Sequence, residues 1–138
     1  MALKWYTVVV DCIDPRAQAH WWAQALDWAV VYDTPEEAVA VPKEAVADED
    51  RPAADLEEWM SRGQGLVFVP VPEGKTVKNR LHIDLAPHTS QDRDAEIERL
   101  IGLGARRVDV GQADDEVTWT VLSDPEGNEF CVLSSRDR

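Results

Sequence analysis

The chain has 138 residues, of which 44% are hydrophobic and 30% are charged, with two cysteines and a formal net charge of −13 at pH 7. This length and apolar share are typical of one compact domain with a core, which excludes intrinsic disorder. No apolar stretch approaches the roughly 20 residues that span a bilayer, and Asp11 interrupts the first one before any cleavage site. We therefore expect a cytoplasmic protein without membrane contact. The net negative charge of the chain repels phosphate backbones, so no nucleic-acid partner is expected.

The first half of the chain predicts one helix among four strands. Residues 5–13 are β-branched and aromatic, as is typical of a strand. Asp14 and Pro15 then supply an N-cap and a first helical position, and we expect the helix to reach Leu26. The residues expected on its buried face have a four-residue spacing: Ala17, Trp21 and Ala25, flanked by Trp22 and Leu26. Later strands are expected at residues 28–32, 38–41 and 66–71.

The segment 42–62 differs from its surroundings because it is acidic and rich in alanine. Leu56, Trp59 and Met60 have the spacing of one short amphipathic helix. We therefore expect a polar insertion that contains a single helix, placed between the third and fourth strands.

The second half repeats this order of elements. Residues 80–86 predict a strand, and Thr89 or Ser90 is expected to cap the helix that follows. The buried stripe of this helix is expected at Ile97, Leu100 and Ile101, and its end at Gly102 and Gly104. Further strands are expected at residues 106–110, 117–122 and 129–134, with a turn over residues 124–128 between the last two.

The two halves therefore indicate a duplication. The expected helix ends around Leu26 and Leu103 correspond at an offset of 77 residues. A single half buries only one face of its sheet, so the predicted fold is α+β, with two βαβββ modules packed as a pseudo-twofold repeat around a shared concave cup. Module one is expected at about 1–75, with an insertion at about 42–62, and module two at about 76–138.

Three local motifs in this order identify a resemblance. They are NRLHIDL at 79–85, LGA at 103–105 and DPEGNEFCVL at 124–133. With the duplicated pattern, they resemble the vicinal oxygen chelate superfamily, which includes glyoxalases, bleomycin-resistance and fosfomycin-resistance proteins and extradiol dioxygenases. The chain is most similar to the glyoxalase-like domains of bacteria. The resemblance covers nearly the whole chain apart from residues 42–62.

The resemblance also implies where a divalent metal would bind. Metal-dependent members draw ligands from the first and last strand of each half, and the matching places here are Thr7, Phe68 or a neighbour, His82 and Cys131. Only His82 is the residue that the family pattern expects. His82 and Cys131 supply two donors, whereas a catalytic zinc site has three protein ligands and magnesium, manganese or iron sites need several oxygen or nitrogen donors. The metal site is thus incomplete, and a divalent ion at His82 is an option rather than an expected cofactor.

Strand alternation selects further candidate site residues. His82 and Asp84 are expected in the cup, opposite Leu81, Ile83 and Leu85, where they form either an acid/base pair or a structural hydrogen bond across the sheet. On the first strand, Asp11 shares the inward face with Thr7 and Val9. Its carboxylate either pairs with a basic group such as Arg80 or contacts a ligand.

The last strands add three more candidates. Glu129 and Cys131 share one face, and Cys131 is either a nucleophile or an inert small side chain in surroundings whose negative charge raises its pKa. A disulfide to Cys12 is not expected, because that residue points to the opposite sheet face. Trp119, in register with Val117 and Val121, either lines a pocket for a flat ligand or belongs to the core.

The sequence therefore favours a small-molecule protein of the glyoxalase-like type. As an enzyme, it would catalyse isomerase, lyase or dioxygenase-like chemistry on a small polar metabolite at His82 and Asp84, with Thr7, Asp11, Arg80, Trp119, Glu129 and Cys131 as ligand-binding residues. The alternative is a metal-free binding or sequestration protein of the bleomycin-resistance type, and a purely structural domain is a third option. A homodimer formed through the tryptophan-rich first helix is also left open.

Overall fold

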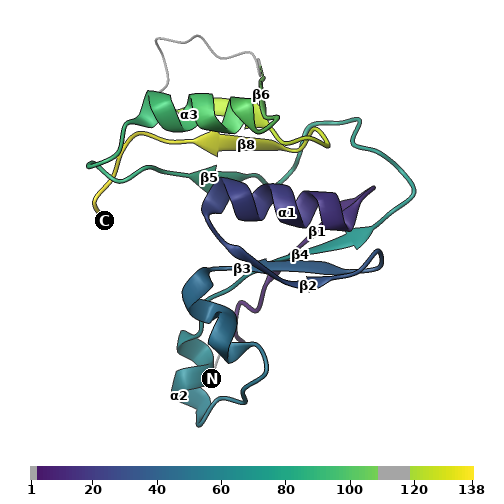
Figure 1. The fold of residues 1–138 in the computed structure, drawn as a ribbon, viewed down its shortest axis with the longest axis vertical. Helices are drawn as coiled ribbons and strands as arrows, with labels where there is room; N and C mark the ends of the chain where they lie inside the picture. The colour runs from purple at the N-terminus through teal and green to yellow at the C-terminus, as the bar shows by residue number, and fades with distance from the viewer. Residues whose placement is uncertain (1–2, 109–118) are drawn as a thin grey trace. The chain divides into compact units, whose positions relative to one another are not determined.

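The computed structural model describes residues 3–108 and 119–138. The chain is a mixed α+β protein with two compact units, residues 1–74 (unit 1) and 75–138 (unit 2), each with one four-stranded sheet (Figure 1). The order of elements in each unit confirms the expected duplicated α+β fold with βαβββ-like modules. The cup expected between the modules stays a prediction.

A membrane-spanning helix would need a long apolar stretch. Among the helices within residues 3–108 and 119–138, none has the length and apolar character to cross a membrane.

Unit 1 contains a sheet in the order β1-β4-β3-β2. Its strands are β1 (Val8–Cys12), β2 (Ala29–Asp33), β3 (Ala38–Val41) and β4 (Leu66–Pro70), which all lie where the sequence predicts them. β1 and β4 pair in parallel, and the other neighbours are antiparallel. Phe68, Ala38 and Ala40 are fully buried, which places the core of this unit on the face that α1 covers.

Helix α1 (Pro15–Leu26) begins and ends as predicted. The Asp14 side chain accepts a hydrogen bond from the backbone N–H of Ala17 at 3.1 Å, which caps the first turn. The expected buried face is wrong at Ala17, which is exposed, because the buried stripe is rotated towards Gln18 and Ala19.

The tryptophans of α1 are part of the core. Trp21 and Trp22 pack edge to face with ring centroids 5.1 Å apart, and their side chains are only 7% and 2% exposed. The idea that these two residues supply an apolar patch for a dimer is therefore wrong. A homodimer itself stays a prediction.

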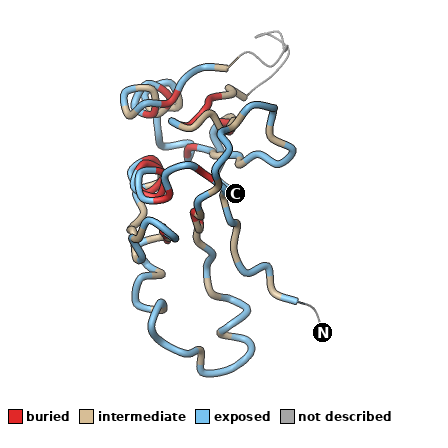
Figure 2. The backbone as a smooth tube through the Cα atoms, turned by 90° about the vertical axis from the view of Figure 1, so that its right-hand side faces the viewer, coloured by how far each residue is buried: buried red, intermediate tan, exposed pale blue. Residues whose placement is uncertain are grey.

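The insertion at residues 42–62 holds two short helices. α2 (Leu56–Ser61) confirms the expected one, whereas the 3₁₀ helix η1 (Lys43–Asp48) was not predicted. Neither helix contains a buried residue, and Figure 2 shows this lowest part of the tube as exposed or intermediate. Its order therefore comes from polar contacts rather than from a core.

Unit 2 has a sheet in the order β5-β8-β7-β6. Its elements are β5 (Ile83–Leu85), α3 (Arg93–Gly102), β6 (Arg106–Arg107), β7 (Thr120–Ser123) and β8 (Glu129–Val132). β5 is shorter than the predicted 80–86, and the expected strand residues within 109–118 lie outside the described residues. Ile97 and Leu100 form the buried stripe of α3, as predicted, while Ile101 is only partly buried.

The predicted N-cap of α3 is wrong. The cap is Asp92, whose carboxylate accepts a hydrogen bond from the N–H of Ala95 at 3.2 Å. The Ser90 hydroxyl instead bonds His88 Nδ1 at 2.7 Å, so it is engaged in the turn before the helix. A carboxylate three residues before a free N–H has the usual capping geometry, and Asp92 fits it better than Thr89 or Ser90.

The helix ends show the internal repeat most clearly. The backbone N–H of Trp28 bonds the Ala23 carbonyl at 2.8 Å, and that of Ala105 bonds the Leu100 carbonyl at 3.0 Å. Both contacts are shifted by the predicted 77 residues. The residues before them, Asp27 and Gly104, have φ values of 55° and 119°, as expected where a chain leaves a helix through a left-handed residue.

Candidate functional site

Three donor side chains gather on one face of the sheet in unit 2. Asp84 is the central residue of β5 and pairs directly with Cys131 of β8 in the parallel ladder. His82 lies immediately before β5, two residues from Asp84, so strand alternation points its side chain to the same face. This arrangement agrees with the predicted common face of His82 and Asp84.

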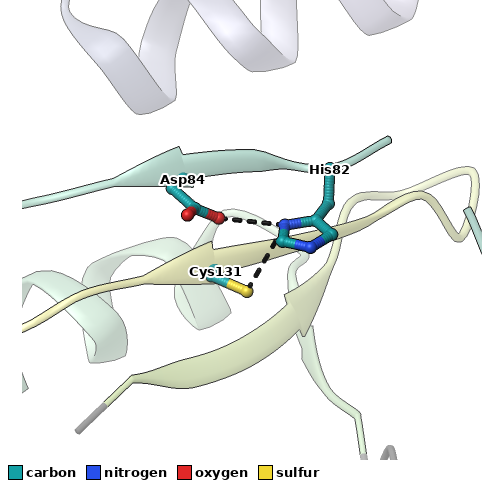
Figure 3. A group of neighbouring side chains, drawn as sticks. All are labelled: His82, Asp84 and Cys131. Atoms are coloured by element: carbon teal, nitrogen blue, oxygen red, sulfur yellow. Dashed lines mark hydrogen bonds and ion pairs between the residues drawn. The ribbon is translucent and has the colours of Figure 1, made fainter. Parts of the chain in front are cut away.

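The three side chains are close enough to act together (Figure 3). His82 Nδ1 lies 3.0 Å from Asp84 Oδ1 and 3.9 Å from Cys131 Sγ, and one donor atom from each residue lies within 4.8 Å of the others. The side chains of His82 and Asp84 are each 43% exposed, whereas Cys131 is buried. The group therefore has two solvent-accessible members above a buried thiol.

The thiol of Cys131 is held in its neutral form. Burial raises its pKa above the usual value, and the negative charge and hydrogen bonding of Asp84 raise it further, against a smaller lowering by Lys78. The sequence suggested a raised pKa because of the surrounding acidic residues, but burial is the larger cause. A raised pKa disfavours a free thiolate nucleophile at neutral pH.

The predicted neighbours of His82 are arranged differently. Leu81 is 90% exposed, so its expected place under the helix is wrong. The reason is that residues 80 and 81 lie in a bend and regular pairing starts only at Ile83. Arg80 is exposed in the same bend, and its expected pairing with Asp11 stays a prediction.

Glu129 has an internal role in unit 2. Its carboxylate forms an ion pair with Lys75 at 2.9 Å and accepts the backbone N–H of Asn79 at 3.1 Å. Burial acts to raise the pKa of Glu129, but the bonds from Lys75 and Asn79 outweigh it, so the pKa is lowered overall. These bonds connect residues 75–79 to β8. They also engage the carboxylate that the sequence analysis expected to bind a ligand.

The remaining candidates lie on several surfaces. Thr7 donates its hydroxyl to the Gly65 carbonyl at 3.0 Å, and Asp11 is exposed on β1. Phe68 is fully buried, so it marks a core position rather than a ligand position. Trp119 is half-buried just before β7, so the expected strand is not found at this residue, and its expected partner Val117 lies outside the described residues.

Unit 1 also contains a groove with a volume of about 630 Å³. Its floor is the open face of the sheet, formed by Val39, Val41 and Val67, and its walls come from the N-terminal residues and the insertion. Tyr6 and Trp59 are the aromatic side chains in these walls. No sequence pattern predicts this groove, because it depends on how residues 42–62 fold back over the sheet.

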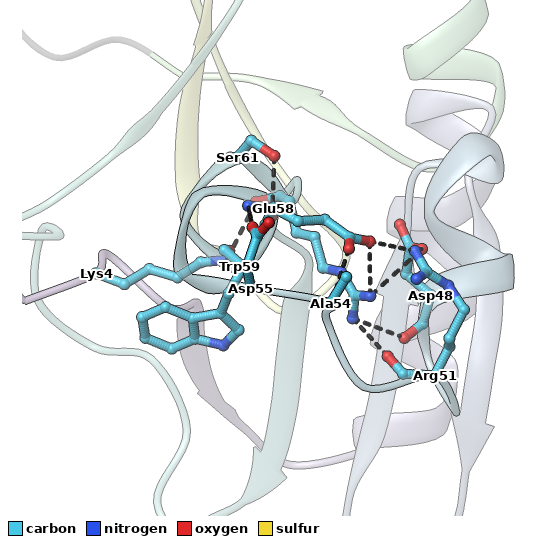
Figure 4. Close-up of polar contacts among 9 residues, drawn as sticks. Lys4, Asp48, Arg51, Ala54, Asp55, Glu58, Trp59 and Ser61 are labelled. Atoms are coloured by element: carbon cyan, nitrogen blue, oxygen red, sulfur yellow. Dashed lines mark hydrogen bonds and ion pairs between the residues drawn. The ribbon is translucent and has the colours of Figure 1, made fainter.

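The cationic side chains that line this groove already contact other groups of the protein. Lys4 Nζ lies 5.0 Å from the Trp59 ring centroid and bonds the Trp59 carbonyl, and Arg51 pairs with Glu58 (Figure 4). Lys4 also bonds the Arg62 carbonyl, and the Arg62 guanidinium pairs with Glu58. By contrast, the carboxylates of three lining residues form no ion pair with a described residue: Glu37, Glu49 and Asp50. The charged side chains of the groove that form no ion pair with a described residue are therefore negative.

The donor set of unit 2 is suited to a metal ion of the zinc type. Zinc accepts imidazole nitrogen, carboxylate oxygen and thiolate sulfur, and catalytic zinc sites have three protein ligands with an open fourth position. His82, Asp84 and Cys131 supply this set. Counting ligands by family position found two donors; the third, Asp84, follows from the alternation that placed it beside His82.

Comparison with known proteins shows the family and the fold. The sequence profile of the glyoxalase-like domain matches residues 7–133. No curated protein matches the chain. A solved structure of a glyoxalase-related enzyme from Fulvimarina pelagi is 14% identical, with a TM-score of 0.63 over 97% of this chain and 89% of that chain.

Two further solved structures are similar. A glyoxalase/bleomycin resistance protein/dioxygenase family enzyme from Burkholderia phytofirmans PsJN is 15% identical, with a TM-score of 0.64 over 97% of this chain and all of that chain. The fosfomycin resistance protein FosX from Listeria monocytogenes, in complex with manganese(II) and sulfate, is 11% identical, with a TM-score of 0.66 over 99% of this chain and 93% of that chain. At such identities the likeness concerns the fold, which hosts several chemistries.

Proposed function

Since the chain belongs to the glyoxalase-like domain family, we propose that it is a small-molecule enzyme whose reaction is centred on His82, Asp84 and Cys131. The observation that carries the proposal is the convergence of an imidazole, a carboxylate and a thiol on one partly exposed sheet face. The reaction classes are those of the superfamily resemblance, namely isomerase, lyase or dioxygenase-like chemistry. The substrate is a small polar metabolite, and the protein acts in the cytoplasm.

His82 is the residue that contacts the reacting molecule in the metal-free arrangement. When Nδ1 carries the ring proton, it donates to Asp84 Oδ1 at 3.0 Å, which fixes the ring and leaves Nε2 as the basic atom. Nε2 then takes a proton from a carbon or hydroxyl group of the substrate and returns it to another atom. Asp84 acts through His82 and is a positioning residue.

A divalent ion would use the same residues. His82, Asp84 and Cys131 would hold it, and it would polarise a substrate oxygen as a Lewis acid. Because Nδ1 faces both Asp84 and Cys131, this atom serves either the hydrogen bond or the ion. The two arrangements are therefore alternatives that metal analysis distinguishes.

Turnover of a metabolite panel by the parent protein and two variants tests the proposal. The panel contains 2-oxoaldehyde–thiol adducts, epoxides, 2-hydroxy acids and catechols, and the parent protein is assayed with and without added divalent ions. We expect His82→Ala to reduce turnover by at least about 100-fold, the usual contribution of a positioned acid or base. His88→Ala, in the same unit and outside the group, is the matched control and should keep the parent rate. Full activity of His82→Ala would contradict the proposal.

A second candidate function is supported by the groove of unit 1. A volume of about 630 Å³ is in the range of small-molecule sites, and the groove combines aromatic walls with an apolar floor. Its uncommitted acids, Glu37, Glu49 and Asp50, favour an organic cation with a flat ring. Such a protein would bind and sequester its ligand without a metal, as in the bleomycin-resistance type.

Ligand binding without turnover distinguishes the second candidate from the first. Flat aromatic amines should quench Trp59 fluorescence in the parent protein, and neutral or anionic counterparts should not. Replacing Glu37, Glu49 and Asp50 together by their amides should weaken binding of the amines at least about tenfold. The reason is that the attraction between close opposite charges contributes more than about 1 kcal/mol at low salt. His82→Ala should leave this binding unchanged. Equal binding of cations and anions would exclude this function.

A further inference from the structure

Cys131 stands where metal-dependent members of the superfamily have a ligand on their last strand. A thiol at this position favours a different metal ion from the one that an oxygen ligand would favour. We infer that His82, Asp84 and Cys131 form a thiolate site for zinc-type ions, which selects zinc over manganese. The inference deepens the proposed function, because it names the ion of the same site and rests on that site being the reactive centre. It concerns this chain's own residues, since the manganese complex described above is that of FosX.

The chemistry of the donors carries the selectivity. Manganese and magnesium prefer carboxylate, carbonyl and water oxygens, whereas thiolate and imidazole ligands suit zinc. Two of the three converging donors here are a nitrogen and a sulfur. A hard oxygen-preferring ion would therefore have one favourable protein ligand, Asp84, and zinc would have three.

The separations between donors agree with one small tetrahedral ion. Bonds of about 2.0 Å to nitrogen and oxygen and 2.3 Å to sulfur give tetrahedral edges of about 3.3 Å for N···O and about 3.5 Å for S···N. The observed separations are 3.0 Å between His82 Nδ1 and Asp84 Oδ1 and 3.9 Å between His82 Nδ1 and Cys131 Sγ. The third separation, between Asp84 and Cys131, is at most 4.8 Å, so side-chain adjustments within this group bring the three donors onto one ion.

The internal repeat offers a comparison within the chain. The two parallel ladders end alike, because the N–H of Val71 bonds the Cys12 carbonyl and that of Leu133 bonds the Leu85 carbonyl. One residue earlier, Asp11 pairs with Val69 in unit 1, as Asp84 pairs with Cys131 in unit 2. By this ladder alignment Val9, two residues before Asp11, corresponds to His82, whereas the family resemblance placed Thr7 there. Unit 1 thus has one carboxylate and two aliphatic side chains at these positions, so the nitrogen and sulfur donors distinguish unit 2.

Cobalt(II) is the spectroscopic probe that tests the inference. A cobalt–thiolate bond gives an intense near-ultraviolet charge-transfer band, and a site of oxygen and nitrogen donors does not. The full chain should develop this band at one equivalent of cobalt and lose it when zinc is added. Cys131→Ser should abolish the band, and Cys12→Ser, which removes the other buried cysteine, should keep it. Zinc affinity should fall at least about tenfold in Cys131→Ser and in His82→Ala.

A second measurement needs no change at the site. In the Cys12→Ser chain, Cys131 is the remaining thiol, and zinc should slow its reaction with a thiol reagent, while manganese at the same concentration should not. Tighter binding of manganese than zinc, a cobalt spectrum unchanged by Cys131→Ser, or no protection by zinc overturns the inference. If His82→Ala abolishes turnover while the parent binds no ion, the inference fails and the proposed metal-free reaction stands.

Discussion

Asp84 and Cys131 lie directly opposite each other in the parallel ladder of β5 and β8, at the place that Asp11 and Val69 occupy in β1 and β4. The duplicated scaffold therefore presents the same backbone geometry twice, and only unit 2 uses it for a nitrogen, oxygen and sulfur donor group. The scaffold and the chemistry of the group can consequently be separated by mutation.

Cys131→Val should remove the sulfur donor and keep the fold. Unit 1 accommodates valine at the matching position, and a small hydrophobic exchange in a core changes the free energy of unfolding by less than about 1.5 kcal/mol. Urea unfolding followed by tryptophan fluorescence measures this change. Phe130→Ala in the same strand is the contrasting variant: its side chain is 1% exposed, and its loss should cost about 3–5 kcal/mol. Similar losses in both variants would show that Cys131 is a packing residue.

Helix capping gives a test of the corrected start of α3. Asp92→Ala should lower the free energy of unfolding by about 1 kcal/mol, because the N–H of Ala95 loses its acceptor. Ser90→Ala should cost less, since Ser90 bonds His88 and leaves the helix capped. Asp14→Ala should resemble Asp92→Ala, as expected for the matching cap of α1. Chemical denaturation of the three variants ranks them, and a larger loss for Ser90→Ala would refute the cap assignment.

These caps illustrate which parts of the fold the sequence could predict. The strands of unit 1, the limits of α1 and the repeat of 77 residues depend on local signals such as Asp14, Pro15 and the apolar spacing, and they were predicted. The exposure of Leu81 depends on where strand pairing starts, and the helix η1 depends on contacts made by the whole insertion. At the site, alternation predicted the common face of His82 and Asp84, and the family resemblance predicted Cys131 at the same site. The direct pairing of Cys131 with Asp84 depends on the ladder register, which the sequence does not show.

Gly65 has a packing role that a single methyl group can reveal. A Cβ at this position would lie 2.6 Å from the Ala40 carbonyl oxygen and 2.8 Å from Val41 Cγ1, and the first of these is backbone that cannot move aside cheaply. Gly65→Ala should therefore destabilise the chain by about 1–3 kcal/mol, as expected for overpacking. Gly63→Ala is the matched control, because nothing lies within 4 Å of its added Cβ. Thermal unfolding should separate the two variants, and equal melting temperatures would contradict the close approach.

The insertion should loosen in acid. Hydrogen bonds from Arg51, from the backbone of Ala54 and from Arg62 lower the pKa of Glu58 to about 2 from 4.5. A carboxyl group whose folded-state pKa is depressed stabilises the fold above its unfolded pKa, so this contribution is complete above about pH 4.5 and is lost as the pH falls towards 2. Limited proteolysis between residues 48 and 62, with an acid-active protease, should accelerate across this window.

A matched pair of variants isolates the role of Glu58 in that window. Glu58→Gln should make the insertion sensitive to protease already at neutral pH and should flatten the acid dependence. Glu57→Gln changes an exposed neighbour on the same helix turn and should retain the parent profile. High salt should weaken the protection in the parent only modestly, because the hydrogen bonds to Arg51 and Arg62 are short-range contacts. A parent-like profile of Glu58→Gln would assign the order of the insertion to other contacts.

The contact between Lys75 and Glu129 should stabilise unit 2 more than the surface ion pairs of the chain do. Their side chains are only 18% and 12% exposed, whereas those of Lys43 and Asp27 are 61% and 88% exposed. Removing one partner leaves a partly buried charge, so Lys75→Met and Glu129→Gln should each cost about 1–3 kcal/mol, while Lys43→Met should cost less than about 1 kcal/mol. In a double-mutant cycle, the two changes together should cost less than the sum of the single changes, because the second removes the charge that the first left unpaired. Additive losses would mean that Glu129 is held by the N–H of Asn79 alone and that its carboxylate remains available to a ligand.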